Sequence, residues 1–480
     1  MSSADFFRNL MGRIARQRRA WFPDKEAPLA LTANLRPDFA ALFDALLSGK
    51  GEASGVALAR DILDAWAAVD AGQKRGFFQL LAEAYGPSTA RLEKAIAAYQ
   101  AAPGLRTEAA LHRASEPRRQ EVLRRLNLAP GGVATLVKMR EYLLGIKKGD
   151  AALEALDADF AHLFGSWFNR GFLVLERIDW STPANILERI IQYEAVHQIH
   201  DWNDLRRRLA PPDRRLYAFF HPQLVDDPLI FVEVALAGAI PDNIHDVLTD
   251  SRDVVDPKAA TTAVFYSISN CQEGLRGISF GNFLIKQVVE DLRRELPGID
   301  TFVTLSPVPG LARWLKEMRA DEGEASGFLS SADRMVLQAL DRADWALSPA
   351  LAESVNAVLA RITAHYMLRA RTADGRVIDP VARFHLGNGA RLERINPFGD
   401  RSTNGMRQSH GVMVNYLYDL GDIEANHEAL ATRGEVVASP AVHGLLAEPE
   451  AAAPAPAGGR FRFGGFNRSR GEARPKEARS

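Results

Sequence analysis

The chain has 480 residues, more than one hydrophobic core usually holds together, which predicts two domains. Hydrophobic residues make up 47% and charged residues 25% of the chain, as in ordinary globular proteins. The 59 lysine and arginine residues are balanced by 60 aspartate and glutamate residues, so no net charge draws the chain to nucleic acid or to an anionic membrane. No apolar run reaches the ~18 residues that a membrane-spanning helix needs, so we expect neither nucleic acid nor a membrane as a partner.

Residues 1–22 are amphipathic and rich in arginine, as organellar targeting peptides are. They contain Asp5 and lack the apolar core of a secretion signal, so we interpret them as an ordinary first helix of a cytoplasmic protein. The one cysteine, Cys271, cannot form an internal disulfide, which fits a reducing compartment. We interpret this cysteine as a buried structural thiol.

Residues 37–165 are dense in alanine, leucine and arginine, and their apolar residues recur at helical spacing. Glycine and proline pairs near residues 86, 103 and 130 divide the region into helices of ordinary length. No segment of it shows the alternation that is typical of a strand. We therefore predict a helical domain over residues 1–165.

The pattern changes after residue 165, where short runs of β-branched, aromatic and other apolar residues begin. The runs at 261–270 and 299–306 flank a segment, 284–296, whose apolar residues share one helical face. This order of strand, loop, helix and strand predicts a βαβ unit with a right-handed crossover. We also predict helices at 331–370 and strands at 172–178, 215–222, 229–236, 381–386 and 411–418.

Residues 441–480 consist mostly of alanine, proline, glycine and arginine, with few large aliphatic side chains. Such a segment cannot bury enough apolar surface to offset its ordering entropy, so we predict a disordered tail. We interpret its arginines as solvated rather than as a binding site for an anion.

The loop after the run at 261–270 contains G-I-S-F-G at Gly277–Gly281, which matches the nucleophile elbow of α/β-hydrolases. A true elbow places its serine directly on the turn after the strand, but six residues separate Asn270 from Gly277. No HGGG-type oxyanion segment precedes it, so a hydrolase is disfavoured. In the alternative interpretation, backbone N–H groups at the start of the next helix bind a pyrophosphate, because small residues such as Ser279 and Gly281 permit its approach. Walker A and G-x-G-x-x-G patterns are absent, which argues against ATP and dinucleotide binding by those routes.

The segment TLSPVPGLARWL ends a predicted strand at Ser306, and taken alone that serine is interpreted as a turn residue. Together with five other blocks, the segment resembles the malonyl-CoA decarboxylase family over about residues 165–420. The other blocks are FYSISNCQEGLRGISFGNFLIKQVV, FHLGNGARLERIN, MVNYLYDL, WFNRGFLVLERIDWSTP and YEAVHQIHDWNDLRRRL. Several blocks in one order are far more specific than a single motif.

The resemblance implies an α+β architecture, in which an N-terminal all-α domain assists homo-oligomerisation as a dimer or tetramer. The catalytic domain, residues 166–440, is then expected to have the mixed α/β fold of GCN5-related N-acetyltransferases. The family pattern implies that Ser306 and His385 are catalytic, with Tyr418 as a further residue of the pocket. It also implies that the substrate, malonyl-CoA, places its pyrophosphate on Arg276, Gly277, Ile278, Ser279, Phe280, Gly281 and Asn282. Animal members carry glutamate at the position of Ser279, so the function of an acid there does not carry over to this chain.

The implied activity is decarboxylation of malonyl-CoA to acetyl-CoA and CO2 through a thioester enolate. Because the thioester itself accepts the electrons, no metal or organic cofactor is required. The protein must supply donors for the enolate oxygen, each commonly worth ~3 to 4 kcal/mol, and a proton for the new carbanion. His385 suits proton delivery because an unperturbed pKa of about 6.5 leaves both protonation states accessible at neutral pH. Serine is a poor base, so a proton-accepting function for Ser306 is not explained by its chemistry.

Two other functions stay open: a coenzyme A-dependent acyltransferase, which needs an open groove for an amine acceptor, and a noncatalytic acyl-CoA-binding protein. His410 lies beside the last predicted strand and competes with His385 as the functional histidine. His197 and His200 have H-x-x-H spacing on a predicted helix, but no third ligand is evident, so we expect a surface position and no metal. Asn388 and Gly389 are predicted to form a turn that closes a hairpin.

Overall fold

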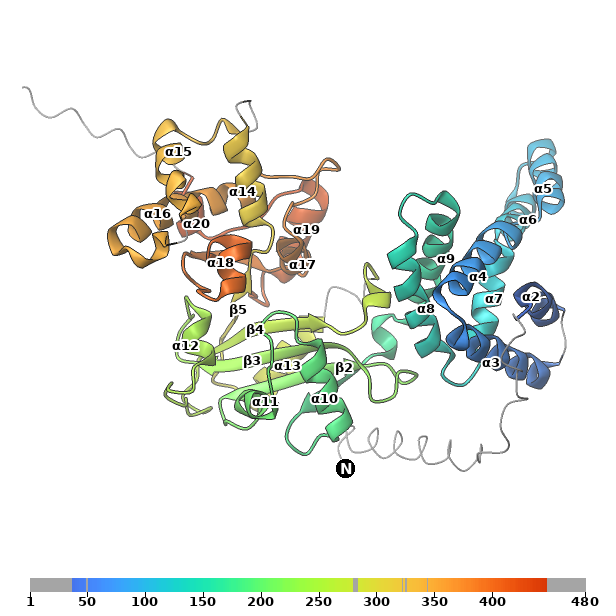
Figure 1. The fold of residues 1–480 in the computed structure, drawn as a ribbon, viewed down its shortest axis with the longest axis horizontal. Coiled ribbons are helices and arrows are strands. Elements are labelled where there is room, and N and C mark those ends of the chain that lie inside the picture. Colours follow the sequence, from blue (N-terminus) through green and yellow to red (C-terminus); the bar gives the residue numbers. More distant parts are fainter. Residues whose placement is uncertain are drawn as a thin grey trace, which may run out of the picture.

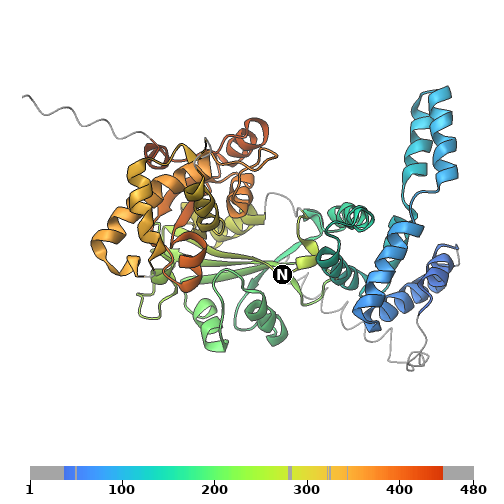
Figure 2. The same ribbon diagram turned by 45° about the horizontal axis from the view of Figure 1, so that its top comes forward.

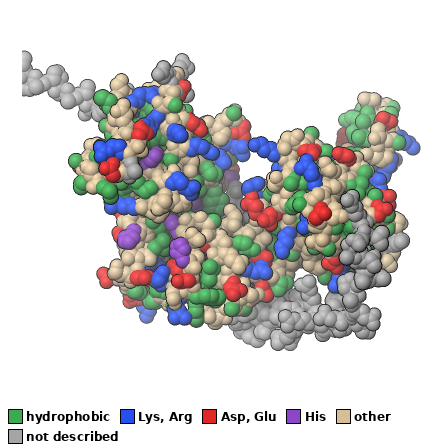
Figure 3. Space-filling view, viewed as in Figure 1, with side chains coloured by type: hydrophobic (Ala, Val, Ile, Leu, Met, Phe, Trp, Pro, Cys, Tyr) green, Lys and Arg blue, Asp and Glu red, His purple; other side chains and the backbone are tan. Residues whose placement is uncertain are grey.

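The computed structural model describes residues 37–48, 51–278, 284–321, 323, 326–342 and 344–446. An all-helical part is followed by a part built on one mixed sheet and further helices, which confirms the predicted fold class (Figure 1). Acidic and basic side chains are interspersed on the visible face, as the balanced composition predicts (Figure 3). The predicted first helix, loop residues 279–282 and most of the predicted tail lie outside the described residues.

The first part is a bundle whose core is aromatic, as the helical spacing predicts. Phe43 and Phe77 are almost fully buried, and their rings meet edge to face with centroids 5.1 Å apart. A hairpin of two helices, α5 and α6, projects away from the other helices (Figure 2). No strand occurs among the described residues from 37 to 167. The helices are α2 (Phe39–Leu47), α3 (Glu52–Ala68), α4 (Ala71–Ala84), α5 (Thr89–Ala101), α6 (Leu105–Ser115), α7 (Arg118–Asn127), α8 (Gly132–Ile146) and α9 (Ala151–Trp167).

Among the described residues, the second part contains one sheet of eight strands. The predicted βαβ unit lies at the centre of this sheet. The strands are β1 (Val174–Ile178), β2 (Arg214–Phe220), β3 (Pro228–Ala237), β4 (Thr262–Asn270), β5 (Thr301–Thr304), β6 (Ser306–Pro307), β7 (Arg391–Asn396) and β8 (Met413–Leu417). Their order is β1-β2-β3-β4-β5-β8-β6, and β7 pairs with β8. Only β4 and β5 run parallel, connected through α13 (Leu284–Glu295); every other pair is antiparallel.

Alternate residues of the central strands bury two different faces of the sheet. On one face, Val232 and Phe265 belong to a core that includes Leu284 of α13. On the other face, Leu216 and Phe231 pack with α10 (Ala184–Tyr193) and α11 (Trp202–Leu209), and α12 (Ile244–Leu248) covers the far end. We call the first the α13 face and the second the α12 face.

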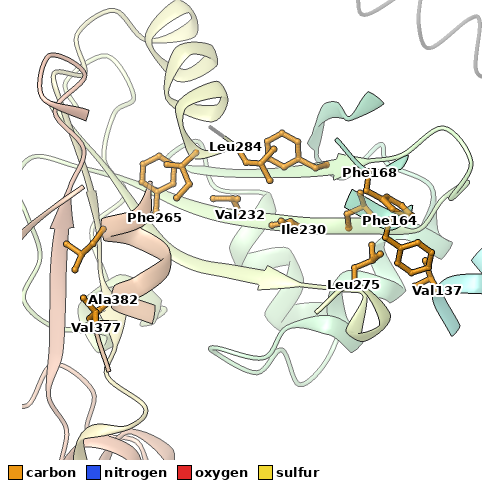
Figure 4. Close-up of a cluster of buried hydrophobic side chains, with 14 of the residues drawn as sticks. Val137, Phe164, Phe168, Ile230, Val232, Phe265, Leu275, Leu284, Val377 and Ala382 are labelled. Atoms are coloured by element: carbon orange, nitrogen blue, oxygen red, sulfur yellow. The ribbon is translucent and has the colours of Figure 1, made fainter. Parts of the chain in front are cut away.

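The helical bundle is joined to the sheet at the end of β4. Val137, Phe164 and Phe168 of the bundle lie against Leu275 and Ile230 (Figure 4). Gly274 packs so closely against α8 that a Cβ atom there would lie 2.0 Å from the carbonyl oxygen of Val137. The buried Arg140 of α8 donates to the carbonyl oxygens of Gly274 (2.7 Å) and Arg276 (3.0 Å).

The helices after residue 310 are α14 (Leu311–Ala320), α15 (Ser331–Leu337), α16 (Pro349–Leu368), α17 (Pro380–Gly387), α18 (Thr403–Ser409), α19 (Ile423–Arg433) and α20 (Pro440–Gly444). The strand predicted at 381–386 is wrong, because these residues form α17. Asp379 caps this helix by accepting from the backbone N–H groups of Val381 and Ala382, both at 2.9 Å, and Pro380 occupies its first turn. Asn388 and Gly389 do turn the chain, but they end this helix rather than a hairpin.

Two further segments differ from the expectations. Strand β7 was not predicted, because its polar sequence, RLERIN, hides the alternation. The first residues of the predicted tail form α20, in which Ser439 caps the backbone N–H group of Val442 and the Val442 side chain is buried. Among the described residues, no helix has the length and apolar character needed to cross a membrane.

Candidate active site

Strands β4 and β5 separate immediately before Ser306. Their pairing runs from Thr262 opposite Thr301 to Phe265 opposite Thr304, and Leu305 N–H donates to Phe265 C=O at 3.0 Å. Beyond this point β4 continues to Asn270, whereas Ser306 pairs with Val414 of β8. The β3–β4 register also shifts here, leaving Tyr266 as an extra residue, and such a bulge bends its strand.

Three predicted residues from different segments meet on the α13 face beside this separation. Ser306 Oγ lies 3.2 Å from His385 Nε2, and His385 Nδ1 lies 2.8 Å from the hydroxyl of Tyr418. The residues come from β6, α17 and the end of β8, and they are only 5%, 3% and 2% exposed. The structure therefore brings together side chains that are separated by up to 112 positions along the chain.

The hydrogen bond from Ser306 to Thr304 favours one tautomer of His385. Ser306 donates its single hydroxyl hydrogen to Thr304 Oγ1 at 2.8 Å. Therefore the 3.2 Å contact between Ser306 and His385 requires His385 Nε2–H to donate to Ser306 Oγ. Nδ1 then carries a lone pair and accepts from the Tyr418 hydroxyl. Ser306 is consequently not hydrogen-bonded as a nucleophile is, because no base accepts its proton.

The site carries no formal charge. Burial lowers the pKa of His385 to about 3, and burial likewise raises the pKa of Tyr418 well above its usual value of 10. No charged group contributes to either shift, so both residues are neutral at pH 7. The expectation that His385 is accessible in both protonation states at neutral pH is therefore wrong, because its ring is almost completely removed from water.

Two residues that were not predicted support these three. The ring of Tyr416 stacks on that of His385, with centroids 4.6 Å apart and an angle of 23° between the planes. Thr304 Oγ1 accepts from both Ser306 and the backbone N–H of Tyr416. Thr304 lies two positions before Ser306, and Tyr416 lies two positions before Tyr418. Because residues two apart in a strand point to the same face of a sheet, this spacing is the signal in the sequence that could have identified them.

Comparison with known proteins identifies the family to which this arrangement belongs. The family model described as malonyl-CoA decarboxylase C-terminal domain matches residues 171–455, and the malonyl-CoA decarboxylase N-terminal domain matches residues 85–168. The chain belongs to the malonyl-CoA decarboxylase family. The resemblance of the sequence blocks is thereby confirmed, while the predicted limits of the domains stay a prediction.

Individual members of the family match along most of the chain. The mitochondrial malonyl-CoA decarboxylase of Anser anser anser is 35% identical over 354 residues, which are 69% of this chain and 70% of that protein. The Rattus norvegicus protein of the same name is 34% identical over 372 residues, 73% of this chain and 75% of that protein. The crystal structure of malonyl-CoA decarboxylase from Rhodopseudomonas palustris is 58% identical and superimposes with a TM-score of 0.81, covering 84% of this chain and 98% of that chain. The crystal structure of malonyl-CoA decarboxylase from Agrobacterium vitis is 60% identical and superimposes with a TM-score of 0.82, covering 86% of this chain and 100% of that chain.

The loop implied by the family to bind coenzyme A connects β4 to α13. Of its residues, Arg276, Gly277 and Ile278 are described, whereas Ser279, Phe280, Gly281 and Asn282 are not. Gly277 has a φ of +80°, which favours glycine, and Arg276 pairs with Glu273 at 2.5 Å near the surface. Pyrophosphate binding by this loop stays a prediction.

A large cavity of about 1730 Å³ lies on the other, α12 face of the sheet. Its lining includes Glu194, His197, Asp246, Arg394 and Asp400, but none of Ser306, His385 and Tyr418. The large cavity and the network of Ser306, His385 and Tyr418 therefore lie on different faces of the sheet. Among the described residues, a hydroxyl, an imidazole and a phenol form one buried network on the α13 face.

The predicted H-x-x-H pair, His197 and His200, lies outside the Ser306 network. His197 and His200 were predicted on a helix at the surface, and the helix is wrong, because α10 ends at Tyr193 and Glu194 accepts from the backbone N–H of His197 at 2.7 Å. His200 is exposed, as expected, whereas His197 is half-buried and lines the cavity on the α12 face. Burial lowers the pKa of His197 to about 4. Within the described part of the chain, no group of His, Cys, Asp and Glu side chains is arranged to hold a metal ion.

His410 and Cys271 do not belong to the site. His410 ends α18 with a φ of +54°, and no hydrogen bond of the Ser306 network involves it, so the structure separates it from His385. Cys271 is buried, and burial raises the pKa of its thiol, which fits a structural residue.

The buried neutral His385 predicts a dependence of stability on acid. The folded-state pKa of about 3 lies below the unfolded value of ~6.5, so between these values the unfolded chain binds more protons. The contribution of His385 to the free energy of unfolding is therefore fully present above the unfolded pKa. It falls by roughly 1 kcal/mol per pH unit as the pH drops toward 3. His197 and His410 add slopes of the same sign.

The contribution of His385 can be isolated in the variant His385→Asn, which retains a polar side chain but does not titrate. Urea unfolding at several pH values between 5 and 7 is expected to show a shallower loss of stability for the variant than for the original chain. Equal slopes in the two proteins would contradict the burial of a neutral imidazole.

Proposed function

We propose that this protein converts malonyl-CoA to acetyl-CoA and CO2 at the cluster formed by Ser306, His385 and Tyr418. The observation that carries the proposal is the chemistry of this cluster: it is buried, fully hydrogen-bonded and uncharged, and it lies where β4 and β5 separate. Membership of the malonyl-CoA decarboxylase family indicates malonyl-CoA as the substrate.

The reaction breaks the bond between the carboxylate and the carbon next to the thioester. The electron pair of that bond passes into the thioester carbonyl, giving an enolate, and CO2 leaves as a neutral molecule. One proton added to the carbon then gives acetyl-CoA. We propose that neither a metal nor an organic cofactor takes part, because the thioester accepts the electrons.

An uncharged site favours this step over simple binding. A carboxylate moved from water into a buried site without a cation is destabilised, whereas the departing CO2 is neutral and the enolate charge is delocalised. The donors that turn to the enolate oxygen when the substrate binds are the Nε2–H of His385, which donates to Ser306 Oγ in the free site, and the Ser306 hydroxyl, which there donates to Thr304 Oγ1. Each donor that is aimed at the developing charge commonly contributes ~3 to 4 kcal/mol to the lowering of the barrier.

The same network provides a route for the proton. Tyr418 donates to Nδ1 of His385, whose Nε2–H is directed at Ser306 Oγ. As the ring gives its Nε2 proton toward the substrate, it receives the proton of Tyr418 at Nδ1, so no imidazolate forms in the buried site. Tyr418 is left as a phenolate, which takes up a proton from solvent water when the product leaves. Proton transfer by a positioned group typically contributes ~100-fold or more.

A second candidate, coenzyme A-dependent acyl transfer, is favoured by one observation. The cavity on the α12 face is lined by four carboxylates, Glu194, Asp242, Asp246 and Asp400, which suit an amine acceptor, and by three arginines, Arg208, Arg394 and Arg401, which suit an anionic group. In this alternative the amine nitrogen attacks the thioester carbonyl, coenzyme A leaves as a thiol, and a base on the protein takes the amine proton.

The test is to incubate purified protein with carboxyl-labelled malonyl-CoA and to follow labelled CO2, free malonate, acetyl-CoA and free thiol. We expect one CO2 and one acetyl-CoA for each malonyl-CoA consumed, with no added cofactor. Free malonate would indicate hydrolysis, and thiol release only with an added amine would indicate acyl transfer. Binding without turnover would indicate the acyl-CoA-binding alternative.

The oligomeric state and the compartment also stay proposals. We propose a homodimer or homotetramer, since the projecting hairpin of α5 and α6 exposes Ile96 and Leu105, which are 39% and 84% accessible. A cytoplasmic location is kept as the expectation from the composition.

A further inference from the structure

The ladder between β5, β6 and β8 contains an irregularity directly before Ser306. Val303 lies opposite Leu417 and Ser306 lies opposite Val414, so one register continues through both pairs and places Thr304 opposite Tyr416. Tyr418 N–H donates to Phe302 C=O at 2.8 Å. Because hydrogen-bonded pairs recur every two residues in an antiparallel ladder, Tyr416 N–H is next expected to donate to the carbonyl of Thr304.

Two side chains replace that backbone hydrogen bond. Tyr416 N–H donates to Thr304 Oγ1 at 3.1 Å instead of to the carbonyl oxygen. The displaced carbonyl of Thr304 accepts from the side-chain amide of Asn415 at 2.8 Å. Both side chains are completely buried, and no backbone group at this point loses its partner. The interruption between β5 and β6 at Leu305 is therefore held by specific groups of the sequence.

The replacement connects the sheet to the site. Thr304 Oγ1 also accepts the hydroxyl hydrogen of Ser306 at 2.8 Å, so one oxygen atom bonds both the backbone of β8 and Ser306. We propose that Thr304 and Asn415 are positioning residues for the decarboxylation: they orient the Ser306 hydroxyl and thereby make His385 Nε2 the donor. This inference rests on the proposed function.

Asn415 is itself held in one orientation from the α12 face. Its Oδ1 atom accepts from Asn396 Nδ2 at 2.8 Å and from Arg394 Nε at 3.2 Å, so its amide nitrogen must face the Thr304 carbonyl. The same nitrogen also donates to the carbonyl of Pro241 at 3.2 Å. A rotation of this amide would place two acceptors against each other at Thr304, and the fully buried position excludes water as a substitute.

The test compares Thr304→Val, which keeps the shape and removes the hydroxyl, with Thr304→Ser, which keeps the hydroxyl. Displacing a reacting group by about 1 Å costs ~100-fold, so we expect kcat of Thr304→Val to fall by about 10- to 100-fold, with KM for malonyl-CoA within about threefold. Thr304→Ser is expected to keep kcat within about threefold of the original, because Ser306 and Tyr416 retain their acceptor.

The matched control is Thr363→Val, because Thr363 is also completely buried but donates to Leu359 C=O of its own helix at 2.7 Å, away from the site. Its kcat is expected to be unchanged. As a second variant, Asn415→Asp keeps the acceptor for Asn396 and Arg394 and removes the donor to the carbonyls of Thr304 and Pro241, so its kcat is expected to fall as well. The carbon isotope effect on CO2 release is expected to rise in Thr304→Val as the chemical step becomes slower.

Three outcomes overturn the inference: a folded Thr304→Val with kcat within twofold of the original, a Thr304→Ser that is as slow as Thr304→Val, or a folded Asn415→Asp with unchanged kcat. Failure of the proposed function looks different, because the original chain itself then releases no CO2. In that case NMR of isotope-labelled histidine rings still tests the positioning, since Thr304→Val is expected to disturb the His385 tautomer and Thr363→Val is not.

Discussion

Replacing His385 by alanine is expected to lower kcat by at least ~100-fold while KM for malonyl-CoA changes little, because the variant loses both an enolate donor and the proton relay. The ring is the centre of the network: Nε2 contacts Ser306 and Nδ1 contacts Tyr418, and no second imidazole is bonded to either group. The measurement is steady-state release of labelled CO2 by the purified variant, with its thermal unfolding midpoint recorded in parallel.

The control for His385→Ala is His221→Ala. His221 is also buried, and burial lowers its pKa, but its ring nitrogens bond the carbonyl of Trp167 and the backbone N–H of Gln223 near β2. That variant is expected to lose stability and to retain kcat. A folded His385→Ala enzyme with a near-normal kcat would remove His385 from the mechanism.

Replacing Ser306 by alanine is expected to lower kcat by at least about tenfold but to leave measurable turnover, since one donor of several is lost. The hydroxyl donates to Thr304 and accepts from His385, so in the proposed mechanism it orients the ring and does not form a covalent intermediate. A nucleophilic serine would give a different result, with nearly complete loss of activity, roughly 10⁴-fold or more, and an acyl adduct in the original chain. The measurement is kcat together with mass spectrometry of the quenched original enzyme.

Ser409→Ala is the matched control for this serine. Ser409 is also buried, at 2% exposed, and its hydroxyl donates to the carbonyl of Val412 at 2.7 Å, outside the site. Its kcat is expected to stay normal. A covalent acyl group on Ser306, or a near-normal rate in Ser306→Ala, would contradict the orienting function.

The sequence predicted the central βαβ unit because its signals are local. The run of β-branched and aromatic residues at 261–270, the single apolar face of 284–296 and the breakers that follow it identify β4, α13 and β5 without tertiary information. The misassigned segment 381–386 shows the opposite case: its β-branched and aromatic residues favoured a strand, but the cap at Asp379 and the proline at 380 started a helix. Capping was the stronger signal, and it was present in the sequence.

The meeting of Ser306, His385 and Tyr418 was not predictable from spacing. It depends on how α17 crosses the end of the sheet, which long-range packing decides, and only the family resemblance placed the three residues together beforehand. The hydrogen bonds from Tyr416 N–H to Thr304 Oγ1 and from Asn415 to the Thr304 carbonyl were even less predictable. They replace a regular backbone hydrogen bond that every strand pattern assumes to be present. The half-buried position of His197 beside the cavity likewise follows from tertiary packing.

The most direct test of the central claim is a crystal structure of the slow variant His385→Asn with malonyl-CoA bound. We predict that the malonyl group lies on the α13 face, with its thioester oxygen within hydrogen-bonding distance of Ser306 Oγ, between the separating ends of β4 and β5. A malonyl group seated in the cavity on the α12 face, among Glu194, His197 and Asp400, would contradict the claim.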